Sequence, residues 1–349
     1  MLSVIVDPKL LFSNYPYRSS TSRPYIQHCL EMYEDIQRYT RIDDDVTVVD
    51  IGGNDGTLLA AFKERNPNLD CINVDPCADF AKDCSDKGIR MIPGLWNGET
   101  ARHFVDKKAR VITSTNVFQH AEDILDFARS IHRSLDDVGV WCLEFPYWKK
   151  DLQTNQYDQV YHEHIYYYTV TPLLNLFEQI GFQIVDISKQ EIHGGSLRLM
   201  MKKSGTSACK SIPSYLNEEA EFTPERYKKW GGQAQTHIRK SREYLKDLKQ
   251  RESVKVAAFG AAAKGCVFLN VTGLDDSTID YIIDDTPAKQ GKYMGGTGIR
   301  IVDRSILKTD PPEYLLILAH NFSDFICQSL LPVYQGKFIK MFPEPHVFS

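Results

Sequence analysis

The stretch VTVVDIGGNDGTLLAAF, residues 46–62, constrains the fold of this chain more than any other segment. An apolar, β-branched run ends in a glycine-rich turn, and a helix-forming run follows directly. This order is typical of the first strand, turn and helix of an open α/β sheet, in which ligands bind at the carboxyl ends of the strands. The sequence therefore predicts a ligand site at this turn.

The composition of the turn distinguishes between two kinds of ligand. Gly52, Gly53 and Gly56 do not match the G-x-G-x-x-G pattern of dinucleotide sites, and Asp50 stands just before them. A pyrophosphate favours bare backbone amides without a nearby carboxylate, whereas S-adenosylmethionine carries an ammonium and a sulfonium group. Asp75, at the end of the next strand-like run, is suited to accept both hydroxyls of a ribose, although alone it could also be a turn-forming residue. Together these features favour S-adenosylmethionine.

Alternating strand-like and helix-like segments continue along the chain, which predicts an α/β fold with a largely parallel sheet. Strands are also expected at 71–75, 109–115 and 138–145, and two runs within 182–203 predict an antiparallel closing pair. A charged helical stretch and a second alternation follow. The expected divisions are a covering segment and helix (1–45), a ligand-binding domain (46–205), a helical linker (206–252) and a smaller Rossmann-like α/β domain (253–349).

Charge and cysteine usage argue against several other classes of protein. The net charge of −5 offers no general attraction to nucleic acid, and no stretch approaches the roughly 20 apolar residues that cross a bilayer. The eight cysteines include no C-x-x-C pair, and the first residues lack the apolar run of a signal peptide. We expect a cytoplasmic monomer or weak homo-oligomer that acts on a small molecule and binds neither nucleic acid nor membrane.

The segment YHEHIYYY, residues 161–168, should arch over the ligand-binding edge of the sheet, and three interpretations of it are open. His162 and His164 could be metal ligands on one side of an extended segment, although no cysteine is near and the helical H-x-x-x-H spacing is absent. The cluster could also pack as an ordinary polar loop. Alternatively, a histidine could act as a base near neutral pH, oriented by a carboxylate or a tyrosine.

Further polar residues follow the expected strand ends at the same edge. His120 comes just after the strand at 109–115, and Glu144 and Tyr147 end the strand at 138–145. Catalytic groups of open α/β sheets lie at these carboxyl ends.

A set of motifs occurs in one order across nearly the whole chain: NYPYRSSTS (14–22), VVDIGGNDGTLL (48–59), NVFQH (116–120), YHEH (161–164), HGGSLR (193–198), GAAAKG (260–265) and DDTPAKQGKYMGGTGIRI (284–301). In order and spacing they closely resemble those of the deoxysugar C-methyltransferases of antibiotic pathways. The resemblance implies a class I methyltransferase domain with a mixed seven-stranded sheet, followed by a smaller Rossmann-like domain. It also implies S-adenosylmethionine as cofactor, a dTDP-linked 4-keto sugar as substrate, and methylation of the carbon alpha to the ketone.

Carried over onto the matching motifs, the resemblance implies that His164 removes the proton from C3′ of the sugar. Tyr161, Glu163, His120 and Tyr17 would complete the active-site group, with Tyr161 or His120 holding the developing oxyanion. The cofactor would contact Asp50, Gly52, Asn54, Gly56, Asp75 and Asn116, the substrate would contact Tyr17, Ser19, Glu144, His193, Lys264 and Lys289, and no metal would take part.

The chain departs from the family in one respect. Members usually carry an amino-terminal zinc-binding domain with C-x-x-C pairs, and this sequence begins at about the point where that domain would end. The departure leaves open a different ketosugar, or transfer to oxygen or nitrogen of a sugar or other small metabolite. A binding protein with a decayed centre is disfavoured by the intact residues Asp50, Gly52, Asp75 and YHEH, and a dehydrogenase by the lack of G-x-G-x-x-G.

Overall fold

A computed structural model of the chain describes residues 1–15, 17–203, 207–252 and 254–348, without the side chains of residues 193 and 252. The contacts divide the chain into two units. The first combines Met1–Trp148 with His162–Ala220, and the second combines Lys149–Tyr161 with Glu221–Ser349. The segment 149–161, expected in the first domain, thus belongs to the second unit, where Tyr157 packs in the same apolar cluster as Ala234 and Leu245.

The first unit is built on a seven-stranded sheet in the order β3-β2-β1-β4-β5-β7-β6, in which only β7 runs antiparallel to the rest. This confirms the predicted mixed sheet and its closing pair, β6 and β7. The edge strand β3 was not predicted, because its four residues are partly exposed and show no apolar pattern. The strands are β1 (Thr47–Ile51), β2 (Asp70–Asp75), β3 (Arg90–Pro93), β4 (Ala109–Thr115), β5 (Leu135–Pro146), β6 (Phe182–Gln190) and β7 (Ser196–Lys203).

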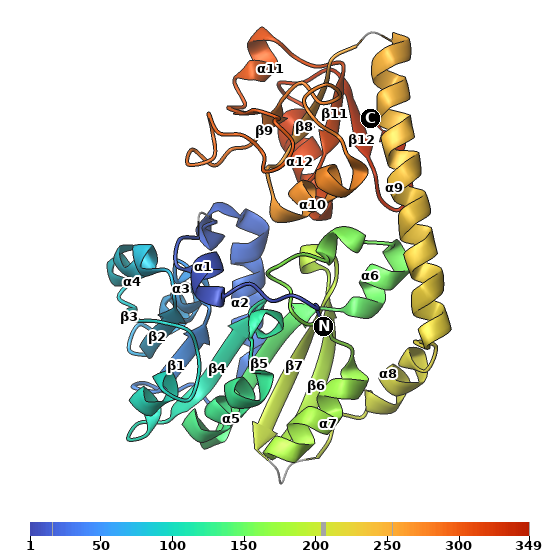
Figure 1. Cartoon of the computed structure of the whole chain (residues 1–349). Coiled ribbons are helices and arrows are strands. Elements are labelled where there is room, and N and C mark those ends of the chain that lie inside the picture. The colour runs from blue at the N-terminus through green and yellow to red at the C-terminus, as the bar shows by residue number, and fades with distance from the viewer. Residues whose placement is uncertain (16, 204–206, 253, 349) are drawn as a thin grey trace. The chain divides into compact units, whose positions relative to one another are not determined.

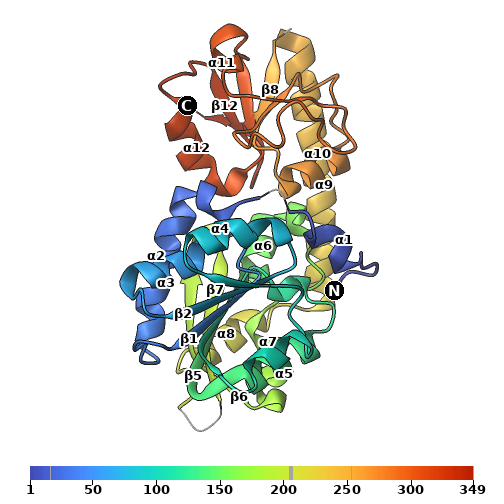
Figure 2. The ribbon, with the colours of Figure 1, turned by 90° about the vertical axis from the view of Figure 1, so that its left-hand side faces the viewer.

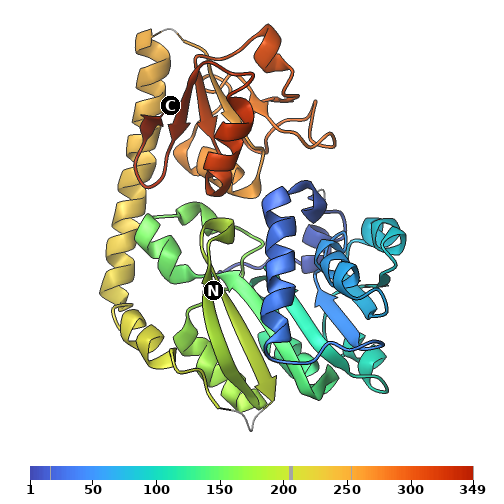
Figure 3. The same cartoon turned by 180° about the vertical axis from the view of Figure 1, so that it is seen from behind.

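Helices cover both faces of this sheet. Helices α2 and α3 pack in one apolar cluster, and α5 and α7 pack in the other, as Figures 1 and 3 show from opposite sides. Because β1 and β4 are covered on both faces, their residues are buried along almost their whole length. The helices are α1 (Pro8–Phe12), α2 (Arg23–Gln37), α3 (Thr57–Arg65), α4 (Ala81–Asp86), α5 (Ile124–Ser134), α7 (Val170–Ile180) and α8 (Ile212–Glu219), with short 3-10 turns such as η4 (Phe118–His120).

The last residue of α8 caps the amino end of α7. The Glu219 carboxylate accepts hydrogen bonds from the backbone N–H groups of Val170 and Thr171, at 2.7 and 2.8 Å, and from the Tyr147 hydroxyl at 2.9 Å. The first N–H groups of a helix lack partners within the helix, and a negative charge is favourable there. This cap explains why α8, expected in the linker, belongs to the first unit instead.

The second unit has a six-stranded sheet in the order β10-β9-β8-β11-β12-β13, in which only β13 runs antiparallel. Helices α9 and α10 cover one face of this sheet, and α11 and α12 cover the other (Figure 2). The order reverses between β8 and β11, the position at which open α/β sheets bind ligands. The strands are β8 (Val256–Phe259), β9 (Ile282–Ile283), β10 (Ile301–Val302), β11 (Tyr314–Ile317), β12 (Lys337–Lys340) and β13 (His346–Phe348).

The helices of the second unit are α6, which begins at the last residue of the first unit, and α9 to α12. Their bounds are α6 (Trp148–Thr154), α9 (Pro224–Glu252), α10 (Ala263–Thr272), α11 (Ile306–Thr309) and α12 (Ser323–Leu330), with the 3-10 turns η5 (Tyr157–Gln159) and η7 (His320–Phe322). Across all the described residues, we find no helix whose length and apolar character would let it cross a membrane.

Candidate active site

The turn between β1 and α3 packs closely against neighbouring side chains of the protein. Gly52 and Gly56 have φ angles of 67° and 76°, in the left-handed region that favours glycine. A Cβ on Gly53 would lie 2.5 Å from Asn73 Oδ1 and 2.6 Å from Asp50 Oδ2. The turn thus requires glycine at all three positions, including Gly53, to which the sequence analysis assigned no role.

Two buried carboxylates, Asp50 and Asp75, lie at this turn. Asp50 is 1% exposed and accepts a hydrogen bond from the Thr113 hydroxyl at 2.7 Å. Asp75 accepts hydrogen bonds from the backbone N–H groups of Asn54 and Cys77, each at 2.9 Å. Burial raises the pKa of Asp50 to about 7, helped by the charge of Asp75, and it also raises the pKa of Asp75. Among the described residues Asp50 forms no ion pair, and a buried carboxylate without a counter-charge favours a cationic ligand. The contact of Asp75 with ribose hydroxyls stays a prediction.

The loop after β4 holds buried polar atoms for which the described residues supply no hydrogen-bond partner. They are Asn116 Oδ1, His120 Nε2 and both polar side-chain atoms of Gln119, a residue that is 2% exposed. The loop touches the glycine turn, because Val117 Cγ2 lies 2.8 Å from where a Cβ on Gly52 would stand. Buried polar groups normally have partners, so this concentration beside the switch point of the sheet marks a ligand site. Gln119 had not been predicted.

Three stacked rings continue from this loop. The Phe12 and His120 ring centroids are 5.1 Å apart at an interplanar angle of 8°, and those of His120 and His164 are 5.3 Å apart at 25°. The backbone N–H of Ile165 donates to the Gln119 carbonyl at 2.9 Å, which fixes the YHEH loop at the carboxyl edge of the sheet. Burial lowers the pKa of His120 to about 3, so this ring is neutral near pH 7.

The paired histidines of YHEH lie in different environments. His162 is exposed and His164 is buried, so the two side chains do not bind one metal ion together. In the described part of the chain, no group of three or more His, Cys, Asp or Glu side chains could hold a metal ion.

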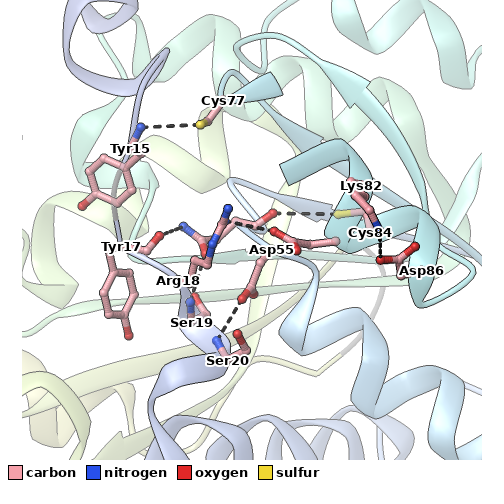
Figure 4. Close-up of polar contacts among 12 residues, drawn as sticks. Tyr15, Tyr17, Arg18, Ser19, Ser20, Asp55, Cys77, Lys82, Cys84 and Asp86 are labelled. Atoms are coloured by element: carbon pink, nitrogen blue, oxygen red, sulfur yellow. Dashed lines mark hydrogen bonds and ion pairs between the residues drawn. The ribbon is translucent and has the colours of Figure 1, made fainter. Parts of the chain in front are cut away.

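The segment before α2 brings a tyrosine hydroxyl to the motif. Tyr15 donates its hydroxyl hydrogen to Glu163 Oε2 at 3.1 Å. Figure 4 shows the second contact of Tyr15, in which its backbone N–H points to Cys77 Sγ. Burial raises the pKa of Glu163, and the Tyr15 hydrogen bond opposes that rise. Tyr17 is 38% exposed and takes part through its carbonyl, which accepts from Asn54 Nδ2 at 3.0 Å. Tyr15, which the sequence analysis missed, rather than Tyr17, thus contacts the motif through its hydroxyl.

Two residues of the glycine turn fasten this segment. Asn54 Oδ1 accepts a hydrogen bond from the Ser19 N–H at 3.0 Å, and Asp55 Oδ2 accepts one from the Ser20 N–H at 3.1 Å. Figure 4 labels Ser20 and Asp55, the partners of the second bond. The side chain of Asn54, expected at the cofactor, is therefore occupied by residues 17–19. The Ser19 side chain is buried beside Asn54. Its contact with substrate stays a prediction.

The Tyr15 contact can be tested by replacing the tyrosine with phenylalanine. Tyr15→Phe removes the hydrogen bond that lowers the pKa of Glu163, so the ionisation of Glu163 should move to higher pH and turnover near pH 7 should fall by about tenfold or more. The measurement is a pH profile of turnover. Tyr17→Phe is the matched control, and a profile altered by Tyr17→Phe but not by Tyr15→Phe would contradict the assignment.

Glu144, expected to contact the substrate, is instead part of a buried ion-pair network. It is fully buried, and its carboxylate lies 2.7 Å from His28 Nε2 and 3.0 Å from Arg198 Nε. Arg198 also pairs with Asp35. Burial alone would raise the pKa of Glu144, but His28 and Arg198 hold it below its usual value. The expectation is corrected because α2 and β7 supply these partners.

Three further residues expected at the site are His193, Tyr161 and Lys289. The side chain of His193 lies outside the described residues, although its backbone belongs to η6 (Ile192–Gly194). Tyr161 ends the segment that belongs to the second unit, whereas Glu163 and His164 belong to the first. Lys289 Nζ donates to the Ala261 carbonyl at 3.0 Å and pairs with Asp284 at 3.3 Å, so its substrate contact stays a prediction.

Two family models match the chain, a methyltransferase domain over residues 25–187 and a C-methyltransferase C-terminal domain over residues 191–343. The chain belongs to the S-adenosylmethionine-dependent C-methyltransferases. The C-methyltransferase NovU of Streptomyces niveus is 28% identical over 354 residues, which cover 99% of this chain and 84% of that protein. The predicted family, fold class and cofactor are thus confirmed.

Two solved structures are similar to this methyltransferase over about half of its length. One is an S-adenosylmethionine-dependent methyltransferase from Geobacter sulfurreducens in complex with S-adenosylhomocysteine, with 13% identity and a TM-score of 0.41, covering 57% of this chain and 99% of that one. The other is an O-methyltransferase family protein from Burkholderia thailandensis, with 16% identity and a TM-score of 0.41, covering 53% of this chain and 57% of that one.

The affinity of the methyltransferase for S-adenosylmethionine should depend on pH through Asp50. The cationic cofactor favours the ionised carboxylate, and protonation below a pKa of about 7 removes that charge. We expect affinity to fall by about tenfold from pH 8 to pH 6, measured by calorimetric titration. Asp50→Asn should bind weakly and lose most of this dependence. Equal affinity of the wild-type protein at both pH values would contradict the assignment.

Proposed function

We propose that the enzyme methylates the carbon alpha to the ketone of a nucleotide-linked 4-keto sugar, such as a dTDP-linked one. Two contacts within the YHEH segment carry the proposal. The His164 ring stacks on His120, and the Glu163 carboxylate accepts a hydrogen bond from the Tyr15 hydroxyl. This group lies at the carboxyl edge of the sheet, next to the loop that touches the cofactor turn. Carbon methylation needs a group that removes a proton, and a histidine with a carboxylate and a hydroxyl nearby can serve as such a general base.

Carbon must lose a proton before it can accept a methyl group. In the proposed reaction, His164 takes the proton from C3′, and the electrons of the broken C–H bond enter an enolate with the 4-keto oxygen. S-adenosylmethionine supplies an electrophilic methyl group on its sulfonium. The new carbon–carbon bond forms at C3′ as the carbon–sulfur bond breaks, and the proton stays on His164 until it passes to solvent.

The neighbouring side chains have roles that follow from their charge states. His120 is neutral at pH 7, so it can offer a ring N–H to the enolate oxygen but no positive charge. Tyr15 orients Glu163, which is next to His164 in the sequence, and an ionised Glu163 would favour the imidazolium that forms on His164. Tyr161 is a further donor for the oxyanion, and one such donor contributes on the order of 3 kcal/mol.

The test is incubation with labelled S-adenosylmethionine and a panel of dTDP-4-keto sugars, together with deuterium exchange at C3′ in heavy water. We expect exchange without cofactor turnover and transfer of label to carbon when both substrates are present. Label on oxygen or nitrogen without exchange would instead support an O- or N-methyltransferase. Neither exchange nor transfer on any member of the panel would reject the ketosugar proposal.

A further inference from the structure

Gln119 is a buried side chain for which the mechanism above has no use. It lies in η4, just after the end of β4, and it is 2% exposed. Neither its Oε1 nor its Nε2 has a hydrogen-bond partner among the described residues. Buried carboxamides normally form hydrogen bonds through both atoms, so this side chain calls for a group that the described chain does not supply.

The backbone that carries this side chain is held firmly in place. The Gln119 carbonyl accepts hydrogen bonds from the backbone N–H groups of Ile165 and Tyr166, at 2.9 and 3.2 Å. The Phe118 carbonyl accepts one from the Tyr168 hydroxyl at 3.4 Å, and the Phe118 and Tyr168 rings stack at a centroid distance of 5.1 Å. Because the turn is fixed by these contacts, the missing partner has to come to the amide.

The position of Gln119 relates it to the proposed base. Val117, at the start of the loop after β4, contacts the glycine turn. At the other end, the Gln119 carbonyl binds Ile165, the residue directly after His164, and the neighbouring His120 ring stacks on His164 at a centroid distance of 5.3 Å. His120 Nε2 also has no partner among the described residues. The unpaired atoms of this end of the loop thus belong to residues that hold the segment of the base.

The charge at this end of the loop limits the class of ligand. The Gln119 amide is neutral, and burial keeps His120 neutral by lowering its pKa to about 3. A buried phosphoryl or ammonium group needs a counter-charge, which neither side chain supplies. The lysines expected at the nucleotide diphosphate, Lys264 in α10 and Lys289, belong to the second unit, and that contact stays a prediction. A ketone oxygen needs only a donor, which a carboxamide offers.

We propose that Gln119 is a further catalytic residue, whose amide donates a hydrogen bond to the keto oxygen of the substrate. The inference rests on the proposed function and deepens it by naming the group that recognises the ketone. As His164 takes the proton from C3′, the electrons of the C–H bond form a C3′–C4′ double bond, and those of the carbonyl π bond move onto the oxygen. The amide proton stays on nitrogen, and its hydrogen bond strengthens as the negative charge develops. The amide oxygen is left to accept from a hydroxyl group of the same sugar.

The test is the rate of deuterium exchange at C3′, measured on the full chain with the dTDP-4-keto sugar that the wild-type protein exchanges fastest. Gln119→Met removes the donor and keeps the length of the side chain. We expect exchange to slow by about 100-fold, while affinity for the sugar nucleotide falls by no more than about tenfold and affinity for the cofactor is unchanged. The melting temperature should stay equal or rise, because the lost groups have no partners among the described residues. A purely structural role predicts a lower melting temperature and an unchanged exchange rate.

Two further variants make the result decisive. Gln119→Glu keeps the shape of the side chain and decides the question if Gln119→Met fails to fold. Above the pH at which its carboxyl group ionises it offers only acceptors, so its exchange rate relative to wild type should fall as pH rises through that ionisation. Gln179→Met, at an exposed glutamine of α7 in the same unit, is the matched control and should exchange at the wild-type rate.

The possible outcomes separate this inference from the proposed function. Wild-type exchange rates in both Gln119 variants overturn the inference alone and leave buried water as the partner of the amide. Loss of exchange together with loss of cofactor binding in Gln119→Met also overturns it, because the amide would then serve the cofactor. No exchange by the wild-type protein with any sugar of the panel overturns the inference and the proposed function together.

Discussion

Replacing His164 with asparagine is expected to abolish deuterium exchange at C3′ of the sugar, with a loss of at least about 100-fold in rate, because a positioned general base contributes roughly 10²- to 10⁴-fold. Methyl transfer should fall with it, since no enolate forms. Cofactor affinity should stay at the wild-type value, because the residues assigned to the cofactor, apart from Asn116 in the loop after β4, lie in β1, at the turn that follows it and at the end of β2. Exchange is followed by NMR, and cofactor binding by calorimetry.

His162→Asn provides the matched control for this experiment. It makes the same substitution two residues away, at a side chain that is exposed rather than buried. We expect exchange close to the wild-type rate. If His164→Asn retains exchange, the base is not His164 and must be sought at Tyr161 or His120. If both variants lose exchange together with cofactor binding, the loop has lost its structure and the base is not identified by this pair.

Replacing Arg198 with alanine is expected to lower the free energy of unfolding by about 3–5 kcal/mol, because it leaves the buried carboxylate of Glu144 without its arginine partner. Arg198 is 1% exposed, so water does not readily replace the lost contact. The measurement is equilibrium unfolding in urea, with the slope of the transition compared between variants.

Two further variants separate charge pairing from simple loss of packing. Arg38→Ala removes an exposed arginine that pairs with Asp35, as Arg198 does, and should cost no more than about 1 kcal/mol. The double variant Arg198→Met with Glu144→Met should recover most of the lost stability, because it removes both buried charges. A loss below about 1 kcal/mol for Arg198→Ala would show that the network contributes little to stability.

The glycine turn after β1 could be predicted because its requirements are local. Gly52 and Gly56 adopt left-handed backbone conformations, and Asp50 and Asp75 end two adjacent parallel strands. Each of these properties depends on residues that are close in sequence, or on a strand alternation that is visible in the sequence. The largely parallel sheet and its antiparallel closing pair followed from the same alternation.

The contacts of the YHEH segment and of Glu144 could not be predicted in the same way. Tyr15 and Tyr17 differ by two positions in one motif, and only the path of the folded segment brings the Tyr15 hydroxyl to Glu163, 148 residues away. Glu144 resembles a substrate contact in sequence because it stands at a strand end. Its burial depends on His28 from α2 and Arg198 from β7, which are 116 and 54 residues away.

The sequence by itself determined the glycine turn after β1, the alternation of the two sheets and the motifs that mark a C-methyltransferase, because these are properties of neighbouring residues. Only the tertiary structure decided which tyrosine meets Glu163, that Glu144 is a buried ion-pair partner, and that residues 149–161 pack with the second unit. These outcomes depend on side chains from distant segments competing for the same partners, and that competition is settled only when the whole chain is packed.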